Sequence, residues 1–157
     1  MDLAKQYVID AIKNAAKDLF ETMIHLPLSS GEVHQDFSKI KKEITAMIGC
    51  AGENRGIMSL FLPERTAFKC VGAMLGMEVN EFDSCINDAV GEMANMIFGG
   101  AKTELYEKKI NFNISTPTVI VGSEYSVYSG DTSNQTVIPF NLGDDKFFIS
   151  FCLKPTE

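Results

Sequence analysis

Polar side chains recur at three- and four-residue steps along residues 88–106. At about 100° per residue they fall within one narrow stripe of a helix. The members of this polar stripe are Asp88, Glu92, Asn95, Gly99, Lys102 and Tyr106. Carboxylates and a carboxamide on one face could serve catalysis, but the same residue types are ordinary on a solvated helix face. Spacing alone therefore favours the structural interpretation.

Other constellations offer no stronger chemistry. The two histidines, His25 and His34, have no metal-ligand spacing, and the glycines form neither a dinucleotide fingerprint nor a phosphate-binding loop. There is also no nucleophile elbow of the GxSxG type. The four cysteines lack any CxxC pair and are predicted to be reduced core thiols: Cys50, Cys70, Cys85 and Cys152. No metal site is expected.

The stripe belongs to a long predicted helix that begins after an N-cap at Asn80 or Asp83 and runs to about Lys109. An apolar face opposite the stripe allows the helix to pack inward. Gly99 and Gly100 in mid-helix each cost about 1 kcal/mol relative to alanine. Close approach of another backbone is one feature that would offset this cost.

The remaining pattern predicts one α+β domain over residues 1–157, with a mainly antiparallel sheet covered by two long helices plus a short helix. A helix is expected from Asp2 to about His25, stopped by Pro27 and Gly31, and a short one from Pro63 to Gly76. The expected strands are 43–50 and 56–62, paired as a hairpin, then 116–121, 125–128, 135–142 and 146–153, with the last turn at Gly143-Asp144. Pro117 and Pro139 are expected at strand starts or sheet edges.

Composition restricts the function classes. The chain has 157 residues, a formal net charge of −7 and 45% hydrophobic residues, which is typical of an acidic globular domain. Nucleic acid is an unexpected partner because its phosphates are bound by clustered Lys and Arg. No run of about 18 apolar residues predicts a membrane span. The start lacks the apolar core of a signal peptide, so a cytoplasmic location is expected.

The segment Asp88–Ile97 resembles the signature of the CheC/CheX/FliY family of chemotaxis phosphatases: an Asp or Ser, Glu four residues on, and Asn three beyond that. Pro117 stands 22 residues after Asn95, as in that pattern, and 111–122 is also similar to CheX sequences. The likeness covers nearly the whole chain. CheC carries two Glu/Asn sites, whereas the first helix here reads Glu21-Thr22-Met23-Ile24 and lacks the asparagine. That departure favours a CheX-like protein.

The resemblance implies hydrolysis of the aspartyl phosphate on the receiver domain of a CheY-like response regulator. Asn95 would aim the attacking water and Glu92 would contact a receiver lysine, with Asp88 and Gly99 as partner-binding residues. The receiver would supply Mg²⁺, so no cofactor of the chain's own is expected. A homodimer sharing a sheet edge is also implied, and Pro139 would place its strand at such an edge.

Two alternatives remain open at this stage. A non-catalytic adaptor could use the same fold to hold a receiver or a flagellar-switch component, although an intact Asp88, Glu92 and Asn95 set favours activity. A small-molecule sensor would need a pocket lined by Met and Phe, but such residues are more often core. The candidates for that pocket are Met58, Phe68, Met74 and Met77.

Overall fold

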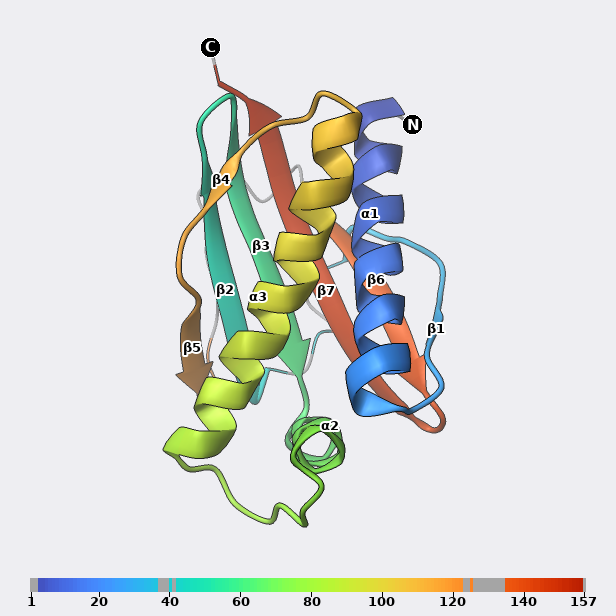
Figure 1. The fold of residues 1–157 in the computed structure, drawn as a ribbon, viewed down its shortest axis with the longest axis vertical. Helices are drawn as coiled ribbons and strands as arrows, with labels where there is room; N and C mark the ends of the chain where they lie inside the picture. Colours follow the sequence, from blue (N-terminus) through green and yellow to red (C-terminus); the bar gives the residue numbers. More distant parts are fainter. Residues whose placement is uncertain (1–2, 37–39, 41, 123–124, 126–134, 157) are drawn as a thin grey trace.

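One antiparallel sheet carries both long helices on the same face, and a short helix closes one end (Figure 1). The computed structural model describes residues 3–36, 40, 42–122, 125 and 135–156. The helices are α1 (Leu3–Leu19), continued by the π-helical turn η1 (Phe20–Ile24), α2 (Glu64–Leu75) and α3 (Ser84–Glu107). The strands are β1 (Ser29–Ser30), β2 (Ile44–Ala51), β3 (Asn54–Leu62), β4 (Asn113–Ile114), β5 (Thr118–Val121), β6 (Thr136–Leu142) and β7 (Asp145–Pro155). The predicted α+β class is confirmed.

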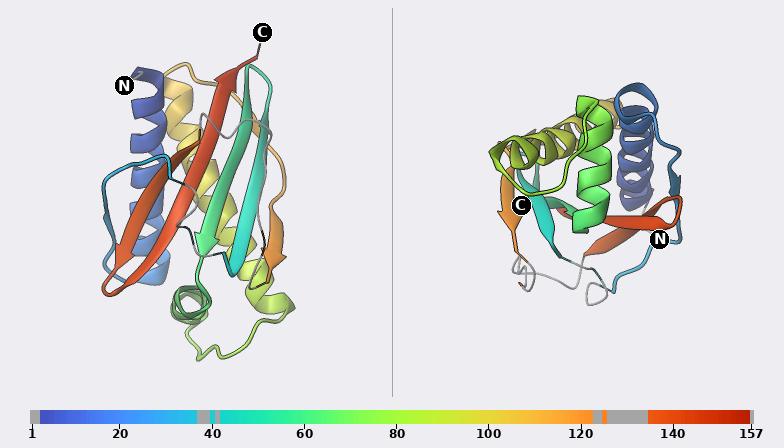
Figure 2. Two further views of the ribbon diagram at one scale, coloured as in Figure 1. Left: turned by 180° about the vertical axis from the view of Figure 1, so that it is seen from behind. Right: turned by 90° about the horizontal axis from the view of Figure 1, so that it is seen from below.

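Two hairpins form the centre of the sheet. The strand order is β1-β6-β7-β3-β2-β4, and β5 also pairs with β2. The predicted β2–β3 hairpin is confirmed, with Met47 opposite Ser59. The β6–β7 hairpin turns at Gly143, whose φ of 65° is readily adopted by glycine, as expected for that turn. Views from behind and below place α1, α2 and α3 on one side of the described sheet (Figure 2).

The expectation that Pro139 marks a sheet edge is wrong, because β6 pairs with a strand on each side. β1 pairs with β6 in the register Ser30 to Phe140, and His34 continues this cover through a bridge to Val137. The Gly31 N–H donates to the Pro139 carbonyl over 2.8 Å, so the ring nitrogen of Pro139 also faces this short partner rather than β7. The dimer edge argued from Pro139 is thus already occupied, and a homodimer stays a prediction without that support.

At the opposite edge of the sheet, the two short strands β4 and β5 pair with β2 one after the other. β4 pairs near Cys50, β5 pairs along 44–47, and Ser115 bridges the gap with hydrogen bonds to Gly49. Pro117 directly precedes β5, so its missing N–H removes no bond from the ladder. Its expected place at a strand start is confirmed.

The two long helices run antiparallel and touch along their length. A Cβ at Gly100 would lie 3.2 Å from the Ala15 Cβ and 3.9 Å from its Cα. Asn14 donates to Glu104 over 2.9 Å, and the Lys108 ammonium lies 4.9 Å from the Tyr7 ring centroid. The predicted close approach therefore explains Gly100 but not Gly99.

The helix ends follow local signals read from the sequence. Asp83 is the N-cap of α3, since its carboxylate accepts the Ile86 N–H over 2.9 Å. Gly76 ends α2 with a φ of 66°, as predicted. The first helical segment ends at His25, whose own φ is 60°, before Pro27 is reached.

A few expectations about single segments need correction or fall outside the described residues. Of the predicted strand 125–128 only Tyr125 is described, and it is not in a strand. No local pattern predicts the two-residue strands β1 and β4. Cys85 is exposed at the start of α3 and is not a core thiol, whereas Cys50, Cys70 and Cys152 are buried as predicted. None of the described helices is long and apolar enough to cross a membrane.

Candidate functional site

The polar stripe lies on the outer face of α3, as its spacing predicts. The inner face is buried against the sheet and α1 through Ile86, Val90, Met93, Ala94, Ile97, Phe98, Ala101 and Leu105. Asp88, Glu92 and Tyr106 are exposed, and Asn95, Gly99 and Lys102 are half-buried. The structure therefore brings all six predicted positions into one outward row.

Three side chains of this row, Asp88, Glu92 and Asn95, are uncommitted, which here means that no other described residue bonds to them. Within the described part of the chain, no hydrogen bond or ion pair engages the side chains of Asp88, Glu92 or Asn95. Asp88 and Glu92 are separated by four residues on α3, a spacing at which two like charges destabilise a helix by about 0.2 to 0.5 kcal/mol. No described lysine or arginine relieves this repulsion by pairing with either carboxylate.

A close contact between α3 and the edge strand holds the row in place. A Cβ at Gly91 would lie 3.4 Å from Val119 Cγ2 and 3.5 Å from Pro117 Cγ. Gly91 precedes Glu92 and lies one turn before Asn95, so this contact sets the distance of these two residues from β5. Pro117 thus packs against α3 at Gly91.

Gly99 leaves the surface beyond Asn95 open. Apart from its own stretch of helix, no described atom lies within 4 Å of the point that its Cβ would occupy. Packing within the chain therefore does not explain this glycine. Its one evident effect is to keep the helix surface low between Asn95 and Lys102, which is what the approach of a partner requires.

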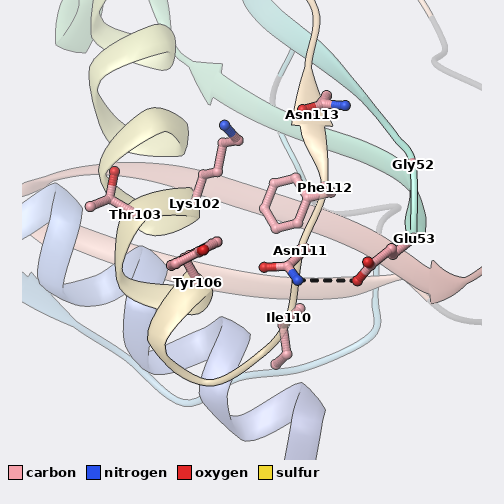
Figure 3. Close-up of a pocket in the computed structure, with 9 residues that line it drawn as sticks. All are labelled: Gly52, Glu53, Lys102, Thr103, Tyr106, Ile110, Asn111, Phe112 and Asn113. Carbon is pink, nitrogen blue, oxygen red and sulfur yellow. Dashed lines mark hydrogen bonds between the residues drawn. The ribbon is translucent and has the colours of Figure 1, made fainter.

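A cavity of about 480 Å³ adjoins the C-terminal end of the stripe (Figure 3). Its walls come from α3, from the β2–β3 turn and from the segment before β4. The lining residues are Gly52, Glu53, Lys102, Thr103, Tyr106, Ile110, Asn111, Phe112 and Asn113. The Asn111 amide donates to Glu53 over 3.1 Å, and its buried Oδ1 has no partner among the described residues.

Sequence reasoning found only the α3 side of this cavity. Lys102 and Tyr106 follow from the helical period, whereas Glu53 and Asn111 are 58 residues apart and meet only because β4 pairs with β2. No local signal in the sequence predicts that pairing. The predicted stripe therefore contains only the α3 residues of the cavity, and its opposite wall was not predicted.

The alternative sensor pocket is not formed. Met58 is fully buried in the core, while Met77 is 59% exposed, so the two do not line one space. Phe68 instead packs on Phe82, with ring centroids 4.9 Å apart. Met58 is a core residue, as the sequence suggested, whereas Met77 lies on the surface instead.

Nucleophilic or metal chemistry has little support elsewhere. Burial raises the pKa of the Cys50 and Cys70 thiols to about 12, which keeps both protonated and unreactive. Among the described residues, no three His, Cys, Asp or Glu side chains group in a way that could hold a metal ion. The polar stripe is therefore the best candidate site for a reaction or a partner.

Comparisons with known proteins agree with this assignment. A family model described as chemotaxis phosphatase CheX matches residues 44–141, which include the whole stripe. A CheY-P phosphatase CheX of Thermotoga maritima is 32% identical over 92 residues. That match covers 58% of this chain and 59% of the relative, so it spans less than two thirds of the relative's length.

Solved structures share the fold over almost the entire chain. The chemotaxis protein CheX of Vibrio vulnificus is 27% identical, with a TM-score of 0.86, over 94% of this chain and 99% of that one. A CheX of Borrelia burgdorferi, solved in complex with CheY, BeF3 and Mg²⁺, is 21% identical with a TM-score of 0.78. It covers 94% of this chain and 97% of that one, which shows a common fold.

Proposed function

The chain belongs to the CheX family of chemotaxis phosphatases, and we propose that it hydrolyses the aspartyl phosphate of a CheY-like receiver domain. The observation that carries this proposal is the outward row on α3, in which Glu92 and Asn95 are uncommitted and one helical turn apart. The Thermotoga relative, named as a CheY-P phosphatase, supports the same activity.

Asn95 is the residue that positions the attacking water. Its carboxamide can accept from and donate to a water molecule without carrying charge. A carboxylate at this position would repel the phosphoryl oxygens, whereas the neutral amide can sit beside them. Holding the water in line with phosphorus removes orientational entropy from the barrier. Since the Asn95 side chain bonds to no other described residue, it need not break such a hydrogen bond to do this.

The reaction needs little further chemistry from this chain. The water oxygen bonds to phosphorus while the bond from phosphorus to the aspartyl oxygen breaks, and the carboxylate leaves as such. The water proton ends on inorganic phosphate. The receiver supplies the Mg²⁺ that neutralises charge on the phosphoryl group. The chain itself contributes the positioned water and a surface that holds the receiver over it.

Glu92 serves as the charged contact that fixes the receiver in register. Its carboxylate is exposed and pairs with no side chain in the described ranges, so a lysine beside the receiver's phosphorylation site can reach it. Asp88, one turn earlier, adds a second negative charge on the same side. Gly99 lets the receiver's loops approach the helix, because no side chain rises there.

The direct test is phosphate release from a phosphorylated CheY-like receiver with Mg²⁺, at a receiver excess that requires several turnovers. The expected result is faster release with the wild-type chain and with Asn14→Ala, a matched asparagine variant on α1, but not with Asn95→Ala. Receiver binding without any acceleration by the wild type would contradict the proposal and favour the adaptor function.

A further inference from the structure

The polar stripe continues for about three turns of α3 beyond Asn95, to Tyr106. At 1.5 Å per residue, Lys102 lies ~10 Å and Tyr106 ~16 Å further along the helix axis. A standard interface buries about 800 Å² on each partner, which is wide enough to reach both. Resting on the proposed function, we infer that Lys102, Tyr106 and the adjoining cavity form a second anchor for the receiver. This second anchor takes an acidic side chain that stands beside an apolar one.

The helix surface between the two anchors has no side chain at Gly99. Gly99 lies between Asn95 and Lys102 on the stripe, and no described atom beyond its own stretch of helix lies within 4 Å of the point that its Cβ would occupy. A partner seated over Asn95 therefore meets no side chain at position 99 on its way to Lys102. Gly99 thus allows one partner to contact both Asn95 and Lys102 while it lies close to the helix between them.

The cavity offers an apolar floor for the second contact. Phe112 is 4% exposed and forms part of the buried core, and Ile110 is half-buried beside it. In Figure 3 the Phe112 ring and the side chains of Lys102 and Tyr106 border the same space. Burying a partner's apolar side chain in this space of about 480 Å³ removes apolar surface from water on both sides.

Lys102 is the cation that this cavity leaves unpaired. The carboxylate in the lining, Glu53, already accepts from Asn111 over 3.1 Å. In the described part of the chain, Lys102 has no ion pair or hydrogen bond through its ammonium group. Tyr106 is 72% exposed, and tyrosine is one of the residue types that dominate binding energy at interfaces. The chemistry of the cavity therefore fits a carboxylate with an apolar neighbour.

The order of charges along α3 gives the receiver one orientation. Asp88 and Glu92 make the N-terminal part of the stripe negative, and Lys102 makes the C-terminal part positive, ~15 Å beyond Glu92. A receiver that presents a lysine to Glu92 and a carboxylate to Lys102 satisfies both ends. The reversed orientation would bring like charges together at both ends, which such interfaces disfavour. Lys102 thereby acts on specificity, at a distance from the reacting atoms.

The test compares two charge reversals in the full chain. Lys102→Glu changes the second anchor, and Lys13→Glu makes the same change of net charge at a half-buried lysine of α1 outside the stripe. Binding is titrated with a receiver carrying BeF3 and Mg²⁺ in place of the phosphoryl group. We expect Lys102→Glu to weaken binding about tenfold. Lys13→Glu is expected to weaken it less than about twofold, through long-range repulsion alone.

Two further variants separate a specific contact from a change in folding. Lys102→Arg keeps the charge and should hold most of the affinity, while Tyr106→Ala should weaken binding about fivefold. The exposed Tyr106 can be truncated without disturbing the core. In turnover measurements the losses should fall on KM rather than kcat, because neither side chain reaches the reacting atoms.

The outcomes separate this inference from the proposed function. Receiver binding that depends on Lys102, without phosphate release by the wild type, would support the second anchor and contradict the phosphatase activity. Equal losses with Lys102→Glu and Lys13→Glu, or none with either, would overturn the second anchor while leaving the activity intact. The cavity would then be vacant or hold a small ligand. Absence of any receiver binding would overturn both.

Discussion

The two long helices lie side by side, yet their polar side chains differ in whether they are paired. On α1, several polar groups are paired: Gln6 donates to Asp10 over 2.9 Å, and Lys17 lies 3.9 Å from Glu21. Asn14 donates across to α3. On the α3 stripe, the side chains of Glu92 and Asn95 have no partner among the described residues.

This difference is informative because α1 and α3 carry the same types of polar residue on their outer faces. On α1 the intrahelical pairs stabilise the helix by a few tenths of a kcal/mol each. On α3 the like charges at Asp88 and Glu92 destabilise it by a similar amount, and Gly99 adds about 1 kcal/mol more. Destabilising residues at three positions of one helix surface, Asp88, Glu92 and Gly99, are typical of a surface that binds a partner.

The largest expected effect is the loss of turnover in Asn95→Ala. Removing the amide that orients the water should lower kcat by about 100-fold or more, because a misplaced reactant costs at least that much. Binding of the BeF3-loaded receiver should change less than about threefold. Single-turnover decay of the phosphorylated receiver and a binding titration measure the two quantities. A parallel loss of affinity would show that Asn95 holds the receiver rather than the water.

Glu92→Lys should have opposite effects on binding and on stability. A lysine facing the receiver's lysine should weaken affinity about tenfold. The same change turns the Asp88–Glu92 repulsion into an attractive pair, which should raise the free energy of unfolding by about 0.5 kcal/mol. Receiver titration and urea unfolding test the two parts. Unchanged affinity would remove Glu92 from the interface.

The neighbouring glycines provide a matched pair for stability. Gly99→Ala should stabilise the chain by about 0.5 to 1 kcal/mol, because its Cβ would enter open space. Gly100→Ala should gain less or lose stability, since its Cβ would meet the Ala15 Cβ at 3.2 Å. Urea midpoints of the two variants give the comparison. A larger gain at Gly100 than at Gly99 would contradict the packing described for α1 and α3.

The smallest effect is expected on α1. Lys17→Ala removes an exposed pair with Glu21 and should change the free energy of unfolding by less than about 0.5 kcal/mol. Phosphate release should be unaffected, because this pair lies outside the polar stripe. A substantial loss of turnover in this variant would mean that α1 also contributes to the receiver surface, and the contrast between the helices would fail.

The features predictable from the sequence are those set by local rules. The helical period places Asp88, Glu92 and Asn95 on one face whatever the rest of the chain does. Asp83 and Gly76 act as caps through their own side chain or backbone freedom. The hairpin between β2 and β3 follows from two apolar runs around a short turn.

The features that escaped prediction depend on distant partners. β1 exists because Ser30 pairs with Phe140, and this pairing also places Pro139 one strand inside the edge. The cavity beside Lys102 needs Glu53 and Asn111 brought together by β4. No local pattern predicts such long-range pairing, so the contribution of Glu53 and Asn111 to the cavity follows only from the three-dimensional structure. Conversely, whether the unpaired polar groups on α3 are a site could not follow from spacing alone.

The most direct test of the role of Asn95 is the decay of acyl phosphate on a saturating CheY-like receiver with Mg²⁺, followed with the wild type, Asn95→Ala and Asn14→Ala. We expect equally fast decay with the wild type and Asn14→Ala, and decay near the receiver's own rate with Asn95→Ala although it still binds. Undiminished acceleration by Asn95→Ala would contradict the central claim that the uncommitted amide on α3 positions the attacking water.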